Sequence, residues 1–209
     1  MTKKETTPVT MISIPKPKFE TLDIKIIGTS ELITHAWSAK TKKEMLEKQQ
    51  GKKTPRSKRN PEAEYQEAMY KFDEDGNPFD GHSDQCAWFG FPAVAFKNAA
   101  VRASQQFGFK MTESRQWFWT FGTESTDFVT IEGDKPYMRE DMIRLNGKTA
   151  DLRYRPGFKN WSTVLRVQIN AEIIAPETII NLIAQSGFSV GIGEWRQEKN
   201  GQYGCFRVG

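Results

Sequence analysis

The ten residues at 161–170, WSTVLRVQIN, constrain the fold more than any other stretch of the chain. One set of alternate positions is mostly apolar and the other is mostly polar. The first set is Trp161, Thr163, Leu165, Val167 and Ile169, and the second is Ser162, Val164, Arg166, Gln168 and Asn170. This alternation predicts a strand with one buried side and one wet, partly basic side. A sheet built on such a strand needs helices on only one of its faces.

Two amphipathic segments are predicted to be those helices. In residues 91–108, FPAVAFKNAAVRASQQFG, a helix is expected to start at Pro92 and to be capped by Gly108. Its inward stripe would consist of small and aromatic residues: Phe96, Ala99, Ala100, Ala103 and Phe107. Residues 175–187, APETIINLIAQSG, are expected to start at Pro176 and to be capped by Gly187. Both helices would pack behind the sheet through these apolar faces.

Further strands are predicted at 21–34, where Leu22, Ile24 and Ile26 alternate, and at 128–133 and 136–147. The order of these elements approximates β-α-β-β-α-β. We therefore expect an α+β fold of the ferredoxin-like or RRM-like type, whose open sheet face can hold single-stranded nucleic acid.

The length of 209 residues suits one domain with an insertion. Residues 1–20 are polar and proline-spaced, which predicts a flexible N-terminal arm, and 21–209 would form the single domain. The insertion is expected at about 36–90, with helices at 38–51 and 60–72. Asn60 and Pro61 provide the N-cap and first position of the second of these helices.

The insertion also carries most of the positive charge. The chain has a net charge of +4, yet nine basic and two acidic residues between positions 40 and 59 give that segment +7. Its basic residues are Lys40, Lys42, Lys43, Lys48, Lys52, Lys53, Arg56, Lys58 and Arg59. A basic segment on a slightly acidic body suggests a polyanion as partner, although a solvated loop has the same composition.

Several classes of function are not indicated. Cys86 and Cys205 lack metal-ligand spacing, so no metal and no cofactor are expected. No apolar run is long enough to span a membrane, and no secretory signal is visible at the N-terminus, which predicts a cytoplasmic protein. His35 and His82, the two histidines, have no obvious partner for acid–base chemistry.

The glycine-rich stretch 189–206, SVGIGEWRQEKNGQYGCF, allows more than one interpretation. No helical pattern follows its glycines, so a dinucleotide-binding loop is not indicated. Asn200 and Gly201 predict the turn of a β-hairpin. Gly191 and Gly193 then indicate a close approach of the backbone to a helix or to a ligand.

Three segments of the chain resemble the RAMP superfamily, the ferredoxin-like proteins that include the backbone subunits of CRISPR effector complexes. Residues 91–104 are similar to the first RAMP helix, 173–185 to the second, and 187–206 to the glycine-rich loop. The spacing of Gly201 and Gly204 departs from the usual end of that loop. The segments follow one another in the family's order, and the start of the chain resembles phage proteins of this general type.

The resemblance implies a protein that binds single-stranded RNA or DNA without sequence preference and oligomerises along the strand into a ring or filament. The insertion at 36–90 would act as a thumb. The implied nucleic-acid-binding residues are Lys40, Lys42, Lys43, Lys52, Lys53, Arg56, Lys58, Arg59, Lys97, Arg102, Arg166, Gly191, Gly193, Arg196 and Lys199. Trp37 and Trp195 are the residues expected to stack on bases, with packing in the core as the alternative.

The same resemblance leaves two other functions open. Some RAMP proteins cut RNA with an aspartate before the first helix, where this chain has Asp80 and Asp84 beside Gly81. Turn residues are the alternative interpretation of both, and we expect no enzyme activity. The third function is a phage inhibitor or assembly factor that acts through protein–protein contacts.

Overall fold

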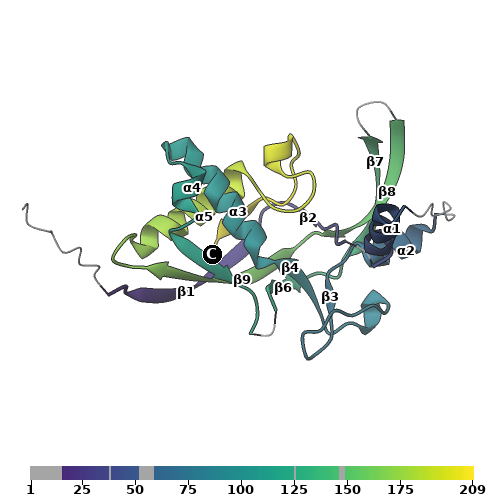
Figure 1. Ribbon diagram of the computed structural model, residues 1–209, viewed down its shortest axis with the longest axis horizontal. Helices are drawn as coiled ribbons and strands as arrows, with labels where there is room; N and C mark the ends of the chain where they lie inside the picture. Colours follow the sequence, from purple (N-terminus) through teal and green to yellow (C-terminus); the bar gives the residue numbers. More distant parts are fainter. Residues whose placement is uncertain (1–15, 38, 52–58, 125, 146–148) are drawn as a thin grey trace, which may run out of the picture.

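The computed structural model describes residues 16–37, 39–51, 59–124, 126–145 and 149–209. The fold is of the mixed α+β class, with two sheets at the two ends of an elongated molecule (Figure 1). Every pairing between the named strands is antiparallel. In the described part of the chain, no helix is both long and apolar enough to cross a membrane.

The larger sheet has seven strands in the order β10-β1-β9-β6-β4-β3, and β5 also pairs with β9. The strands are β1 (Phe19–Gly28), β3 (Lys71–Phe72), β4 (Trp88–Pro92), β5 (Phe118–Phe121), β6 (Phe128–Gly133), β9 (Trp161–Asn170) and β10 (Phe206–Val208). The centre of the sheet is the long pairing of β1 with β9, in which Asp23 lies opposite Arg166. The alternation predicted for 161–170 is confirmed, because its apolar set is buried.

Two helices cover one face of this sheet and leave the other face open (Figure 1). They are α3 (Ala93–Ala103) and α5 (Pro176–Ser189), and they pack against each other as well as on the sheet. Phe96 and Ala100 of α3 and Ile179 and Ile183 of α5 are all fully buried. Their methyl groups and rings, with those of Ile26, Leu165 and Val167 in the strands, form the main core.

The second sheet consists of β2 (Leu32–Ile33), β8 (Thr149–Phe158) and β7 (Tyr137–Leu145). Helices α1 (Ala39–Gln49) and α2 (Pro61–Glu67) lie at this end of the molecule (Figure 1). Helix α2 packs on β8, and the hydroxyl of Tyr65 donates a hydrogen bond of 2.8 Å to the carbonyl of Pro136. The long β7–β8 hairpin therefore belongs to the second sheet and not to the larger one, and the insertion predicted at 36–90 stays a prediction.

The helix predicted over 91–108 is confirmed, and it ends as a 3₁₀ turn, η2 (Ser104–Phe107). The left-handed Gly108, with φ of 82°, closes it as expected. Phe107 was wrongly placed on the inward face, because the tighter turn leaves it 57% exposed. The short helix α4 (Met111–Ser114) follows before β5.

Three other predictions need correction. The helix expected at 60–72 has the predicted cap, since the side chain of Asn60 accepts a hydrogen bond from the backbone of Ala63, but it ends at Glu67. Gly187 is no cap, because α5 continues to Ser189. There a side chain in place of Gly187 would collide with the carbonyl oxygen of Phe206, 2.1 Å away. The expected hairpin at 189–206 is instead an irregular loop that contains η3 (Gln197–Lys199).

Candidate nucleic-acid interface

A groove of about 710 Å³ lies between α3 and the loop 190–205, which we call the glycine loop. Helix α3 contributes Lys97 and Arg102 to its wall, and Arg115 follows α4 into it. The glycine loop contributes Gly191, Gly193, Arg196, Glu198 and Lys199. Six of the residues that the RAMP resemblance implies, from two segments about 90 positions apart, therefore line one groove.

The path of the glycine loop depends on residues without a side chain. Gly191, Gly193 and Gly204 have φ values of 71°, 75° and 66°, in the left-handed region that favours glycine. A Cβ atom on Gly204 would lie 1.7 Å from the carbonyl oxygen of Ile192. The loop can therefore close on itself only with glycine at this position.

The glycine loop is also attached to the second sheet through the segment around β2. The backbone N–H of Glu194 donates a hydrogen bond of 2.9 Å to the carbonyl of Ile33, and that of Gly204 donates one of 2.7 Å to the carbonyl of Glu31. These bonds fix the loop on the side away from α3. The backbone that carries Arg196 and Lys199 is therefore held in place by these hydrogen bonds.

The groove is strongly cationic, since it holds five basic side chains and one carboxylate. The carboxylate is Glu198, whose oxygens lie 2.7 Å from Nε of Arg102 and 2.9 Å from Nη2 of Arg196. Burial raises the pKa of Glu198, but the hydrogen bond from Arg196 and the charges of Arg196 and Arg102 outweigh it, so the pKa is lowered. Glu198 thus forms ion pairs with two of the five cations.

The other three cations of the groove, Lys97, Arg115 and Lys199, form no ion pair with any described carboxylate. Burial lowers the pKa of Lys97, and the positive charge of Arg115 lowers it further. Two like charges within reach of each other, without a counter-charge, create a site that an anion would stabilise.

The glycine loop adds a backbone donor to these side chains. The N–H groups of Gly191, Ile192 and Glu194 donate to carbonyls of the protein, whereas that of Gly193 has no acceptor among the described residues. Backbone N–H groups in such left-handed loops bind anions in many proteins. The groove therefore has the charges and the donors that a phosphate needs.

Arg166 lies apart from the groove, on the open face of the larger sheet. Its Nε is 2.9 Å from Oδ1 of Asp23 on the neighbouring strand. The hydrogen bond from Arg166 lowers the pKa of Asp23, so this pair stays charged at neutral pH. The open face is consequently less cationic at its centre than the sequence suggested.

The described part of the basic segment 40–59 lies near the second sheet. Lys42 is exposed on α1, whereas Arg59 pairs with Glu64 at 2.6 Å and with Asp151. The side chains of Lys40 and Lys43 lie outside the described residues, as do all atoms of Lys52, Lys53, Arg56 and Lys58. Arg59 therefore connects α2 to β8, and the role of the other positions stays a prediction.

The two tryptophans expected to stack on bases lie in different surroundings. Trp37 is 62% exposed and lines a hollow at the β3 edge of the larger sheet with Tyr70 and Phe72. Trp195 is 38% exposed in the glycine loop, and its ring packs edge-on against Tyr203, with centroids 6.5 Å apart. Trp37 thus lies outside the groove, and the ring of Trp195 is partly covered by Tyr203.

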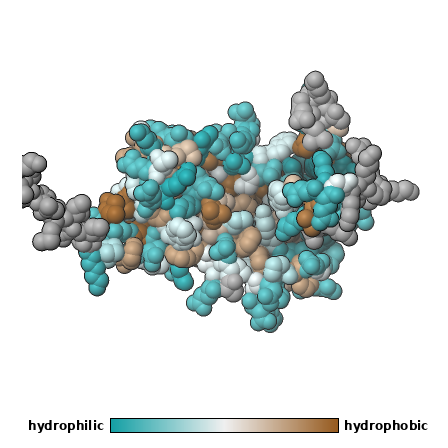
Figure 2. Space-filling view, in the orientation of Figure 1, coloured by the Kyte–Doolittle hydropathy of each residue, from teal (hydrophilic) through white to brown (hydrophobic). Residues whose placement is uncertain are grey.

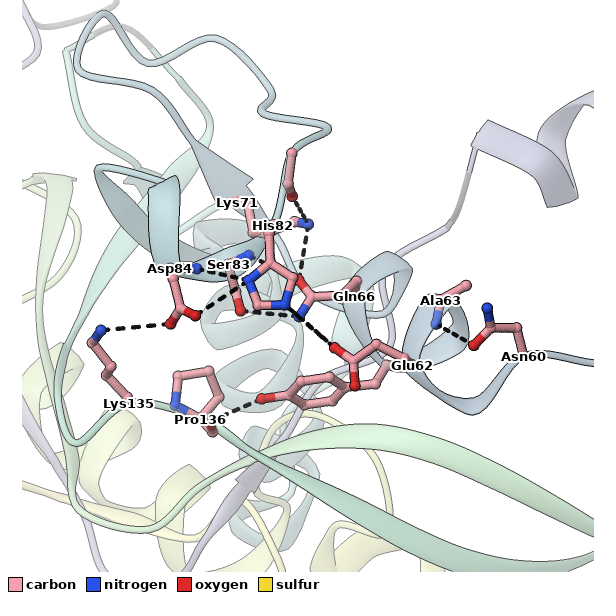
Figure 3. A network of polar contacts seen from close by, with 12 residues as sticks. Asn60, Glu62, Ala63, Gln66, Lys71, His82, Ser83, Asp84, Lys135 and Pro136 are labelled. Atoms are coloured by element: carbon pink, nitrogen blue, oxygen red, sulfur yellow. Dashed lines mark hydrogen bonds and ion pairs between the residues drawn. The ribbon is translucent and has the colours of Figure 1, made fainter.

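Asp84 belongs to a polar surface network that also includes Glu62 of α2, His82 and Lys135 (Figure 3). His82 lies 3.3 Å from Asp84 and 3.5 Å from Glu62, and Lys135 is 3.6 Å from Asp84. His82 therefore has carboxylate partners that the sequence did not reveal. Likewise His35 lies 3.8 Å from Glu194.

Asp80 does not complete a metal site with these residues. It is exposed and lines the hollow beside Trp37. Among the residues that the structure describes, no three His, Cys, Asp or Glu side chains are close enough together to hold a metal ion. The nuclease interpretation of Asp80 and Asp84 thus stays a prediction.

The chain matches no protein-family model. No curated protein matches it either. The resemblance to the RAMP superfamily therefore stays a prediction, based on the three segments that suggested it.

The sequence analysis missed Arg115, which lines the groove, and Trp119, whose ring centre lies 4.4 Å from Nζ of Lys97. Arg115 lies in the stretch MTESRQ, which has neither a periodic pattern nor a cluster of charge. Trp119 lies on β5, a strand of only four residues. The alternation of Trp117, Trp119 and Phe121 was the available signal for a strand there.

Proposed function

We propose that this chain binds single-stranded nucleic acid without sequence preference, with the phosphates in the groove between α3 and the glycine loop. The observation that carries the proposal is the gathering of five cations around one carboxylate, with three of the cations in no ion pair with a described carboxylate. Lysine and arginine bind phosphates and release their counterions, which is a favourable and sequence-independent contribution to binding.

A strand suits this groove better than a small phosphate ligand. Lys97 and Arg102 are five positions apart on α3, which separates them by about 7.5 Å along the helix axis. That distance is about twice the ~3.4 Å rise of a stacked nucleotide, so the two cations suit successive phosphates of a strand that is extended rather than stacked. Arg115 and Lys199 extend the positive surface beyond the helix in the same groove.

We also infer a ferredoxin-like arrangement for the larger sheet. Its support is the strand order β10-β1-β9-β5, with α3 before β5 and α5 between β9 and β10. The RAMP resemblance implies the rest of the proposal: a cytoplasmic subunit that oligomerises along RNA or DNA and uses the insertion as a thumb. The exposed edge of the Trp195 ring, beside the groove, would contact the nucleic-acid strand.

Charge removal in the groove tests the proposal. We expect the double variant Arg115→Gln, Lys199→Gln to bind a 20-nucleotide oligo-dT or oligo-U about tenfold or more weakly at 100 mM salt. The slope of log K against log salt should become shallower by about 1.4, since each phosphate contact contributes about 0.7. Fluorescence polarisation at several salt concentrations measures both quantities.

The matched control removes the same charge elsewhere. Arg144 on β7 is exposed without a described partner, and Lys159 follows β8. The double variant Arg144→Gln, Lys159→Gln should bind like the wild type. Absence of binding by the wild type at 50 mM salt, or equal losses in both double variants, would overturn the proposal.

The two alternative functions predict different results in the same assays. An endoribonuclease that uses Asp80 or Asp84 would cut labelled RNA in the presence of magnesium, and Asp84→Ala would abolish the cutting. An inhibitor that acts through protein contacts would leave oligonucleotides unbound even at low salt. An acidic protein could also bind this cationic groove, so the oligonucleotide assay is the measurement that separates this inhibitor from a nucleic-acid-binding protein.

A further inference from the structure

A shallow hollow of about 680 Å³ lies around the edge strand β5, next to the groove. Trp119 and Phe121 project from β5, opposite Gln168 and Arg166 of β9. Trp119 is 61% exposed, and Phe19, at the rim, is 63% exposed. The space-filling view shows hydrophobic surface at the end of the molecule where β1 begins (Figure 2).

The hollow and the groove are continuous, because Lys97 and Arg115 line both. The Nζ of Lys97 lies 4.4 Å from the centre of the Trp119 ring, a cation–π contact. This contact occupies one face of the indole and fixes its orientation. The exposed fraction of Trp119 shows that much of the ring is left for a ligand.

The lining of the hollow has the chemistry of a surface that binds bases. It consists of aromatic rings, the two cations and the amides of Gln116, Gln168 and Asn170, without a single carboxylate. The side chain of Gln168 forms no hydrogen bond with the described residues. In Asn170, Oδ1 accepts from the backbone N–H groups of Lys18 and Glu172, which leaves its NH₂ group free. These amides can bond the edges of bases that stack on the rings.

We propose that Trp119 and Phe121 form a stacking platform for two successive bases of the strand whose phosphates lie in the groove. This inference rests on the proposed function and adds how the bases are held. Two residues apart on a strand, the two rings are separated by about 7 Å. Stacked nucleotides rise only ~3.4 Å, so each ring takes one base and the strand is extended. A duplex, whose bases are covered on both faces, would not fit.

The choice of nucleic acid over a second copy of the chain follows from charge. A protein surface that covered this hollow would bury Lys97 and Arg115 without a counter-charge from the hollow itself. A strand brings a phosphate with every base. One ligand thus provides both bases that stack on the rings and phosphates that pair with the cations.

The first test replaces the platform ring. We expect Trp119→Leu to weaken binding of 20-nucleotide oligo-dT on the order of tenfold, with an unchanged salt slope, and Trp119→Phe to retain most of the affinity. Phe188→Leu is the control, because Phe188 is an exposed aromatic side chain on α5, at 76%, that lines neither the groove nor the hollow. Thermal unfolding of each variant verifies that the fold is intact.

The second test removes the bases instead of the ring. Wild-type protein should bind oligo-dT on the order of tenfold more tightly than an abasic strand of the same length, and Trp119→Leu should reduce that preference. If the wild type binds neither strand at low salt, the proposed function fails. If it binds both equally, only the platform fails. If Trp119→Leu turns a dimer into a monomer and leaves oligo-dT binding unchanged, the hollow is a self-association surface and the platform is overturned.

Discussion

At the scale of single residues, Glu198 sets the charge of the groove. It is the one carboxylate among the five cations, and it holds Arg102 and Arg196. Its pKa lies below the ordinary value of 4.5, so the carboxylate stays ionised at mildly acidic pH. Since a lowered pKa means that the pairing is lost only as the pH falls through that lower value, we expect nucleic-acid affinity to change little between pH 7.5 and 5.5.

Neutralising this carboxylate should strengthen binding. In Glu198→Gln both arginines become available to phosphates, so oligo-dT should bind several-fold more tightly and the salt slope should steepen by up to about 1.4. Polarisation at four salt concentrations measures this. Glu177→Gln, which removes an exposed charge from the first turn of α5, is the control and should have no such effect. A loss of affinity in Glu198→Gln would mean that the carboxylate serves mainly to position the arginines.

At the scale of elements, the glycine loop depends on close backbone contacts. We expect Gly204→Ala to lower the free energy of unfolding by about 2 kcal/mol or more, because the residue has φ of 66° and its Cβ would lie 1.7 Å from the Ile192 carbonyl oxygen. Gly108→Ala provides the comparison. Its φ is 82° but no atom lies within 4 Å, so only the conformational cost of about 1 kcal/mol applies. Urea denaturation measures both, and equal losses would contradict the argument.

Elements whose signals are local could be predicted from the sequence. The alternation at 161–170 gave both faces of β9, and Asn60 with Pro61 located the start of α2. The strand β8 was missed because TADLRYRPGF has no clear apolar alternation, and its partners are β7 and the distant β2. The hairpin predicted from Asn200 and Gly201 was wrong. Gly201 packs against the backbone of Trp195, where a Cβ atom would lie 1.6 Å from the carbonyl oxygen of Trp195. The glycine thus serves this close contact in an irregular loop.

The candidate site could be predicted only in part. The RAMP resemblance implied Lys97, Arg102, Arg196 and Lys199, and the structure brings these four side chains to one groove. It could not indicate Trp119, whose exposure depends on β5 being the edge strand beside β9. In sequence, an aromatic run such as WFWTF is equally typical of a buried strand.

At the scale of the whole molecule, α1, which carries part of the basic segment, lies outside the groove, at the end that holds the second sheet (Figure 1). If the insertion contacts the strand, reversing the charges of Lys52, Lys53, Arg56 and Lys58 to Glu should weaken oligo-dT binding and leave the melting temperature unchanged. Arg59 is excluded from this set because its bonds to Glu64 and Asp151 hold α2 on β8. Arg59→Glu alone should lower the melting temperature, measured by circular dichroism. Unchanged affinity in the fourfold variant would remove the insertion from the binding surface.

The attachment of the glycine loop to the β2 segment has a mechanical consequence. The Glu194 and Gly204 N–H groups hold this loop to the backbone at Ile33 and Glu31, and β2 is itself the edge of the second sheet. These backbone hydrogen bonds therefore transmit a force applied at one end of the elongated molecule to the other end, because no flexible linker separates the glycine loop from β2. A nucleic-acid strand bound at both ends of the molecule would therefore exert force on the two sheets together.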